Sequence, residues 1–200
     1  RLYILYQLIK GIAYHYSPLW LLIMPAPMLW YLVALIFWRL LYAGLEKIGI
    51  KITWHIVLFF VCLSVAAGFV PWIGREYALS RFVVFAPYFF LGVLVQKKQI
   101  VDIIIKKVNF KLALCVLALT IVFSSIFAIN ALNVRETFSG TLPYPVDGKW
   151  VYAGARLLTY LTSTVIAIAF IRVFSFENKT IGVIGKDSLK YYMFHGICLM

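Results

Sequence analysis

The chain has 200 residues, of which 64% are hydrophobic, 18% are aromatic and only 13% are charged. Soluble domains are typically about 45–50% apolar and about 25% charged, and a globule of this length has too small an interior to hide so much apolar surface. The composition therefore excludes a water-soluble globular protein and predicts a chain that lies in a lipid bilayer.

Five apolar stretches have the length of membrane-spanning helices, and each is bounded by charged residues or by Pro and Gly. A helix needs about 20 apolar residues to cross a bilayer, and none of the five shows the alternation with a period of two that barrel strands require. We therefore expect an all-α, polytopic transmembrane helix bundle. The predicted spans are residues 27–45, 52–72, 79–96, 110–132 and 152–174.

Both ends of the chain have features typical of a cut sequence. The first residue is Arg1, and a sixth apolar run at residues 188–200 is too short to cross a bilayer. We expect residues 1–200 to be part of a single integral membrane domain that is truncated at both ends, with the sixth helix cut. The sequence leaves residues 1–26 undecided between the tail of an earlier helix and an aromatic loop or re-entrant segment.

The formal net charge of +12 has an uneven distribution along the chain. Lys and Arg are enriched in the cytoplasmic loops of membrane proteins, and the connections at residues 46–51, 97–111 and 175–190 carry most of the basic residues, whereas 73–78 and 133–151 carry few. We therefore place the first three connections in the cytoplasm and attribute the charge to topology and to anionic lipid, with no nucleic-acid partner. The cytoplasmic lysines are Lys47, Lys51, Lys97, Lys98, Lys106, Lys107, Lys111, Lys179, Lys186 and Lys190, against Arg75, Arg135 and Lys149 outside.

Two of the connections are long. Residues 97–111 alternate paired lysines with Ile and Val, which is typical of a short amphipathic helix on the inner leaflet, although the pattern also fits a frayed junction between two spans. Residues 133–151 form the extended polar stretch, and their Gly, Pro and Asp content indicates irregular structure able to cap an external site.

Three cysteines, Cys62, Cys115 and Cys198, lie within predicted spans or at the cut sixth helix. Their spacing matches no zinc or redox motif. We expect them to be small buried apolar residues, and we expect no metal site.

Charged residues within the predicted spans are informative because an ionised group in hydrocarbon is costly and normally faces a protein interior. Arg39 and Arg172 lie close enough to the inner face for their side chains to reach the head groups. Arg81 and Arg156 each lie just inside the outer end of a span, and each begins a polar or small helix face. Tyr88 and Gly92 follow Arg81, and Tyr160 and Ser163 follow Arg156. We expect these two faces to line one cleft, the alternative being two arginines that bind lipid phosphate at the outer interface.

His195 lies about 10 Å along the last apolar run, on one face with Ser188 and the tyrosines Tyr191 and Tyr192. An imidazole at that depth needs hydrogen-bond partners, so we expect this face to point into the bundle. A packed structural role and a functional role both remain open for His195.

Three segments together resemble the membrane acyltransferase family 3, and particularly its fucose 4-O-acetylase-like branch. They are PMLWYLVALIFWRLL at residues 27–41, SRFVVFAPYFFLGVLVQKK at 80–98 and IGKDSLKYYMFHG at 184–196. The more specific parts are Arg81 followed by Pro87, three aromatic residues, Leu and Gly92, and the later run of Gly, Ser, Leu, Tyr and His that ends at His195.

The resemblance implies an enzyme with about ten membrane helices in the bacterial inner membrane. Such an enzyme transfers an acyl group, usually acetyl, from acyl-CoA to a hydroxyl of a cell-surface carbohydrate, and acyl-CoA is a donor substrate rather than a bound cofactor. The catalytic histidine of the family lies in the first helix, which would precede Arg1, so the matched residues Trp30, Arg81, Pro87, Ser188 and His195 would be pocket and packing positions. The substrate-binding candidates are Trp30, Arg81, Tyr88, Arg156 and His195.

A transporter or flippase for a polar solute or a lipid-linked sugar is the alternative function. Intramembrane arginines and interrupted helices serve such proteins as well, but the chain has no inverted repeat. The acyltransferase therefore remains the first hypothesis.

Overall fold

The computed structural model describes residues 30–70, 79–130, 143–145 and 147–175. Their secondary structure consists of six α-helices, and no strand occurs in these ranges. The prediction of an all-α chain is confirmed for this part of the protein. The structure divides into two compact units, of which the first contains a single described helix, α3, and the second contains the other five.

Helix α3 spans Trp30–Lys47. It ends at a left-handed residue: Gly49 has a φ of +83°, and the amides of Ile48 and Gly49 bond back to carbonyls of the last turns. Ala34 and Trp38, four residues apart on one face, are buried, whereas Arg39 is exposed. Compared with the predicted span at residues 27–45, the helix ends two residues later, at Lys47, and residues 27–29 lie outside the described part of the chain.

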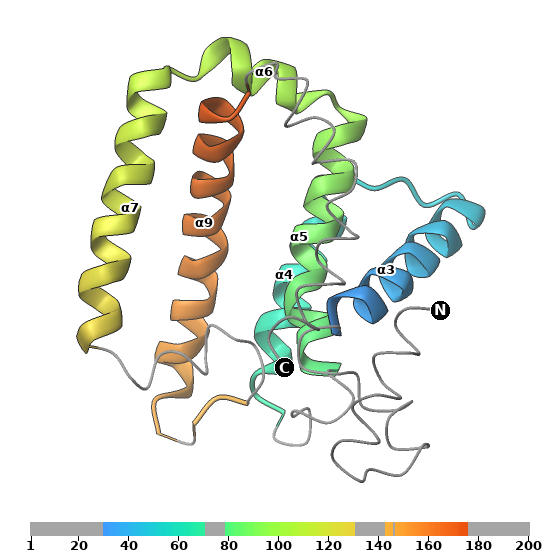
Figure 1. The fold of residues 1–200 in the computed structure, drawn as a ribbon. Helices are drawn as coiled ribbons and strands as arrows, with labels where there is room; N and C mark the ends of the chain where they lie inside the picture. The colour runs from blue at the N-terminus through green and yellow to red at the C-terminus, as the bar shows by residue number, and fades with distance from the viewer. Residues whose placement is uncertain (1–29, 71–78, 131–142, 146, 176–200) are drawn as a thin grey trace, which may run out of the picture. The chain divides into compact units, whose positions relative to one another are not determined.

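The second unit consists of four long helices and one short helix. They are α4 at Trp54–Ala67, α5 at Leu79–Lys97, α6 at Ile100–Lys107, α7 at Phe110–Asn130 and α9 at Lys149–Val173. Figure 1 shows α6 lying across one end of the unit between α5 and α7, with the C-terminal end of α9 beneath it. The ends of α5 and α9 and the start of α7 therefore meet at the α6 end, while α9 begins at the opposite end.

The apolar core of this unit is built mainly between α4 and α5. Phe60 and Phe90 stack face to face with ring centroids 4.3 Å apart, and Phe90 and Leu94 are almost completely buried. The buried face of α4 continues from Phe60 to Ser64, one turn later. A hydroxyl group is thereby placed in an otherwise apolar interface, where it requires a hydrogen-bond partner.

Helix α6 resolves the two interpretations that the sequence allowed for residues 97–111. Gln99 adopts a left-handed backbone with a φ of 50°, which ends α5 and starts a separate helix. Ile104 is buried, and Lys106 and Lys107 lie in the last turn, where cations interact favourably with the helix dipole. The side chain of Asn109 then accepts a bond from the Lys111 amide at 2.8 Å and so caps the start of α7. The amphipathic helix is confirmed, whereas its position on a membrane stays a prediction.

Among the described helices, α9 is long and apolar enough to cross a membrane, while α4 and the Phe110–Phe123 part of α7 are apolar but shorter. Helix α4 has 14 residues, or about 21 Å of helix, although residues 52–72 were predicted to form a full span. Its last turn tightens, since the amides of Gly68, Phe69 and Val70 each bond three residues back. Pro71 follows, and a residue before proline is disfavoured in a helix.

The expectation that the cysteines are buried is wrong for two of them. Cys62 and Cys115 are both exposed, because they lie on outward faces of α4 and α7 that carry exposed apolar side chains such as Leu63 and Leu114. Apolar character was a poor guide to burial here, since these helices expose apolar side chains on several faces. Cys198 lies outside the described residues.

Candidate functional site

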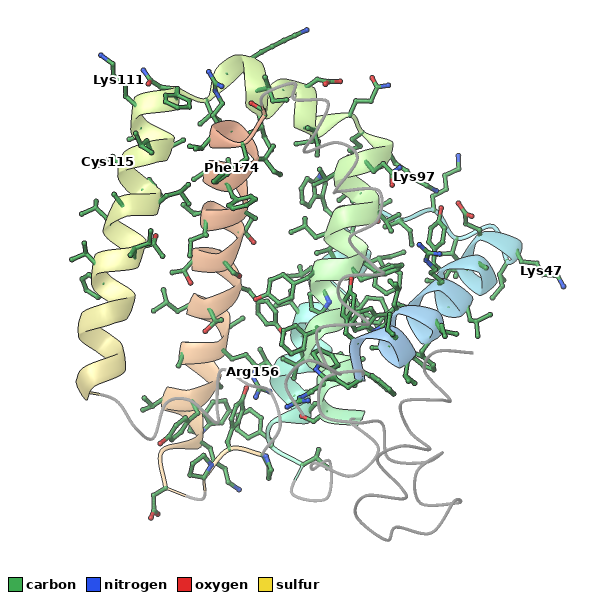
Figure 2. All side chains as sticks on the ribbon, viewed as in Figure 1. Lys47, Lys97, Lys111, Cys115, Arg156 and Phe174 are labelled. Atoms are coloured by element: carbon green, nitrogen blue, oxygen red, sulfur yellow. The ribbon has the colours of Figure 1, made fainter. Side chains whose placement is uncertain are left out.

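Polar side chains from helices α4, α5 and α9 and from the loop that precedes α9 meet inside the second unit. We call this group the polar cluster; Figure 2 shows the position of its central residue, Arg156, on α9. Within α9, Arg156 and Tyr160 lie one turn apart and both are buried, and Ser163 continues the same face. The cluster comprises Ser64 of α4, Tyr88 of α5, Tyr144 of the loop, and Arg156, Tyr160 and Ser163 of α9.

Arg156 contacts the C-terminal end of α4. Its Nη1 donates to the Ser64 carbonyl at 3.0 Å. The Gly68 amide would normally donate to that carbonyl but instead donates to the Val65 carbonyl. Arg156 therefore satisfies an acceptor that the tightened last turn leaves without its helical donor. A cation at this position is also favoured by the negative end of the helix dipole.

Tyr160 joins α9 to both neighbouring helices. Its hydroxyl donates to the Val84 carbonyl of α5 at 2.6 Å, and it also contacts the Ser64 hydroxyl. Because Tyr160 has one proton and gives it to Val84, Ser64 must donate to Tyr160. Pro87 lies inside α5 and has no amide proton, so the carbonyl four residues earlier lacks its usual helical donor. The Val84 carbonyl that Tyr160 contacts lies in the same turn of α5.

A second pair of hydroxyls lies one turn further along. Tyr88 and Ser163 are 2.8 Å apart, and Ser163 donates to the Thr159 carbonyl at 2.6 Å. Since the Ser163 proton is committed to the backbone, Tyr88 donates to Ser163. The rings of Tyr88 and Tyr160 are also in contact, with centroids 5.2 Å apart. In each pair of hydroxyls, one member donates to the other, which in turn donates to a backbone carbonyl. Neither pair supplies a proton acceptor that could act as a base.

Tyr144 closes the cluster from the loop that precedes α9. Its amide donates to the Gly68 carbonyl at 2.7 Å, and its ring lies over the Arg156 guanidinium at 4.6 Å. Gly68 has an ordinary helical backbone, but a Cβ at this position would overlap the Tyr144 ring, so glycine is required by the close approach. Burial raises the pKa of Tyr144, with the charge of Arg156 acting in the opposite direction. The phenol therefore remains a protonated donor at neutral pH.

Three polar atoms of the cluster are buried and have no hydrogen-bond partner among the described residues. They are Nε and Nη2 of Arg156 and the hydroxyl oxygen of Tyr144. Arg156 is 4% exposed and Tyr144 is 5% exposed. Buried polar groups in folded proteins are nearly always paired, so these three atoms are the part of the cluster that still needs a partner.

The residues proposed from sequence as substrate-binding lie in different parts of the structure. Tyr88 and Arg156 both belong to the polar cluster, whereas Trp30 begins α3 in the other unit, where its ring meets the edge of Tyr31. Arg81 is half-buried in the first turn of α5, and its approach to the same cavity as Arg156 stays a prediction. His195 and Ser188 lie outside the described residues.

Two members of the cluster were missed by sequence reasoning. Ser64 is the one hydroxyl-bearing residue within α4, and Tyr144 stands between two prolines in the polar loop. A hydroxyl in an apolar helix and an aromatic ring held by flanking prolines were available signals. The sequence did not show that both would contact the same arginine.

Arg172, at the other end of α9, has different surroundings. Its Nε donates to the Val108 carbonyl at 2.8 Å, and its guanidinium lies 5.6 Å from the centre of the Phe110 ring. These contacts join α9 to the junction of α6 and α7. The predicted reach of Arg172 toward lipid head groups stays a prediction.

The chain was compared with protein-family models, curated proteins and solved structures, and none of the three comparisons found a match.

Proposed function

We propose that the chain belongs to a multi-pass membrane protein that transfers an acyl group from acyl-CoA to a hydroxyl of a cell-surface carbohydrate. In this reaction the acceptor oxygen bonds to the acyl carbon, the thioester C–S bond breaks, and the acceptor proton passes to the CoA thiolate. The multi-pass topology is supported by the membrane length of α9, by the apolar surfaces of α4 and α7, and by the clustering of lysines at one end.

The observation that carries the proposal is the buried polar cluster with its unsatisfied donors at Arg156. Ionisable groups within membrane helices normally mark a substrate path, and this cluster offers donors to a polar molecule without offering a base. Such an arrangement suits an acceptor pocket whose catalytic histidine lies elsewhere, as the resemblance to acyltransferase family 3 implies. Pro87, one of the matched residues, lies in the turn of α5 that Tyr160 contacts.

The donor is expected at the opposite end of the second unit. Lys98, Lys106 and Lys107 are exposed around α6, with Asp102 as an acidic neighbour in its first turn. A group of exposed ammonium ions attracts a polyphosphate such as CoA. An inner donor side and an outer acceptor side are then separated by the length of α9.

The test is the O-acetyl content of surface polysaccharide, measured by NMR in cells that carry full-length variants at matched expression. Deletion of the protein should abolish acetylation of one polysaccharide. Arg156→Lys and Arg81→Ala should each reduce acetylation by about tenfold or more if each loses one charge-assisted hydrogen bond to the acceptor. His195→Ala should cause a smaller loss, through packing of the last helix.

Arg172→Lys is the matched control, since it changes an arginine of the same helix outside the polar cluster, and acetylation should stay near the level of the unmodified protein. Normal acetylation in Arg81→Ala cells would show that Arg81 anchors its helix at the membrane interface and does not bind the acceptor. If deletion leaves acetylation unchanged but blocks uptake or export of a solute, the protein is a transporter and the acyltransferase proposal is wrong.

A further inference from the structure

Arg156 presents one complete edge of its guanidinium without a partner. The Ser64 carbonyl occupies Nη1, and the Tyr144 ring covers the face. The Nε and Nη2 donors, which point along the same edge of the planar group, remain unsatisfied among the described residues. Two parallel N–H donors match the spacing of two oxygens of a carboxylate or phosphate.

The charge balance points in the same direction. The described residues place no carboxylate in contact with Arg156, although it is 4% exposed. A buried cation without a counter-ion is costly, and the α4 dipole and the Tyr144 ring compensate only part of its charge. The Tyr144 hydroxyl, also buried and unsatisfied, adds a third donor and offers no negative charge at neutral pH.

We infer that the Nε–Nη2 edge of Arg156, assisted by the Tyr144 hydroxyl, binds an oxyanion of the acceptor, either a carboxylate or a phosphate. This inference rests on the proposed function, because it names the acceptor class as an acidic or phosphate-bearing carbohydrate. Both side chains are buried, so binding requires a local movement that exposes them. Tyr144 itself is attached to α4 by the hydrogen bond from its amide to the Gly68 carbonyl.

A rival explanation is an internal ion pair. Glu76 and Glu136 occur in the sequence outside the described residues, and either carboxylate has the chemistry to occupy the same edge. The experiment therefore has to distinguish an external oxyanion from one that belongs to the chain.

The binding measurement uses the full-length protein in nanodiscs of phosphatidylcholine, with tryptophan fluorescence or thermal stability as the readout. Glucuronate and inorganic phosphate are the anionic probes, glucose is the neutral probe, and chloride holds the ionic strength constant. Arg156→Lys should raise the dissociation constant of the anionic probe by about tenfold to a hundredfold. Tyr144→Phe should raise it a few-fold, and Arg172→Lys should leave it unchanged.

Three outcomes would overturn the inference. Equal anion affinity in Arg156→Lys and the unmodified protein would show that the edge binds no oxyanion. Thermodynamic coupling between Arg156→Lys and Glu76→Gln or Glu136→Gln in the ligand-free protein would show an internal ion pair. The third outcome is weaker glucuronate binding when the protein is in nanodiscs of phosphatidylglycerol, with this loss absent in Arg156→Lys and with acyl transfer unaffected. It would assign the site to a lipid head group.

The acetylation assay separates this inference from the proposed function. If Arg156→Lys weakens anion binding but the protein transfers no acyl group, the oxyanion site stands and the acyltransferase proposal fails. If the protein acetylates neutral and anionic acceptors equally well, and Arg156→Lys lowers both to the same extent, acyl transfer stands and the oxyanion inference fails.

Discussion

The two arginines of α9 lie 16 residues apart by sequence number, at opposite ends of one helix, and their surroundings differ. Arg172 is half-buried, donates to the Val108 carbonyl and lies beside the Phe110 ring. Arg156 is buried, donates to the Ser64 carbonyl and lies under the Tyr144 ring, but keeps an unsatisfied edge. Both arginines supply a hydrogen bond to a carbonyl near the end of another helix, and both contact an aromatic ring.

The comparison shows that burial and the unsatisfied edge, rather than the residue type, distinguish a candidate site from a packing contact. At the α6 end, Arg172 is only half-buried, so its remaining donors are not enclosed by the protein. At the Tyr144 end, Arg156 is enclosed, and each unsatisfied donor carries a desolvation cost. That cost makes Arg156 the better candidate for function.

The largest expected difference between the two ends is their position relative to the membrane. Asp102 in α6 and Asp147 before α9 are both exposed. In a background where Cys62, Cys115 and Cys198 are alanine, an impermeant maleimide applied to intact cells should label the Asp147→Cys variant and leave Asp102→Cys unlabelled. Permeabilised cells should label both, as the control for reactivity. Labelling of Asp102→Cys alone in intact cells would reverse the topology.

The packing of Tyr144 against α4 predicts the next largest effect. A methyl group at Gly68 must displace the Tyr144 ring, so Gly68→Ala should lower the free energy of unfolding by about 2 kcal/mol. Gly92→Ala is the matched control, because nothing lies within 4 Å of its added Cβ. Unfolding with SDS in mixed micelles would measure both variants, and an equal response would show that Tyr144 does not pack on Gly68.

The smallest expected effects come from the two tyrosines that cross between α5 and α9. Tyr160→Phe should cost about 1.5–2 kcal/mol of unfolding free energy, because it leaves the Val84 carbonyl and the Ser64 hydroxyl without a partner. Tyr88→Phe should cost about 0.6 kcal/mol, since Ser163 keeps its bond to Thr159. The same SDS titration would detect the difference, and a larger loss for Tyr88→Phe would contradict the proton assignment.

Parts of the candidate site could be anticipated from sequence. The helical spacing of Arg156, Tyr160 and Ser163 put three polar groups on one face of an apolar segment, and the same reasoning singled out Tyr88. Ser64 and Tyr144 were not anticipated, because their contribution depends on long-range contacts: Ser64 lies 96 residues from Tyr160 in the chain. Helical periodicity describes one helix at a time and carries no information about which helices become neighbours.

The sequence by itself determined that the chain is helical, apolar and basic at one set of connections, because these properties follow from composition and local periodicity. It also placed the start of α7 at Phe110, but it left residues 97–111 open between an amphipathic helix and a frayed junction. The tertiary structure decided that the end of α4 meets Tyr144 and that Arg156 rather than Arg172 keeps a buried unsatisfied edge. Both outcomes depend on which carbonyls and rings the rest of the chain brings to an arginine, and only the packed chain sets those distances.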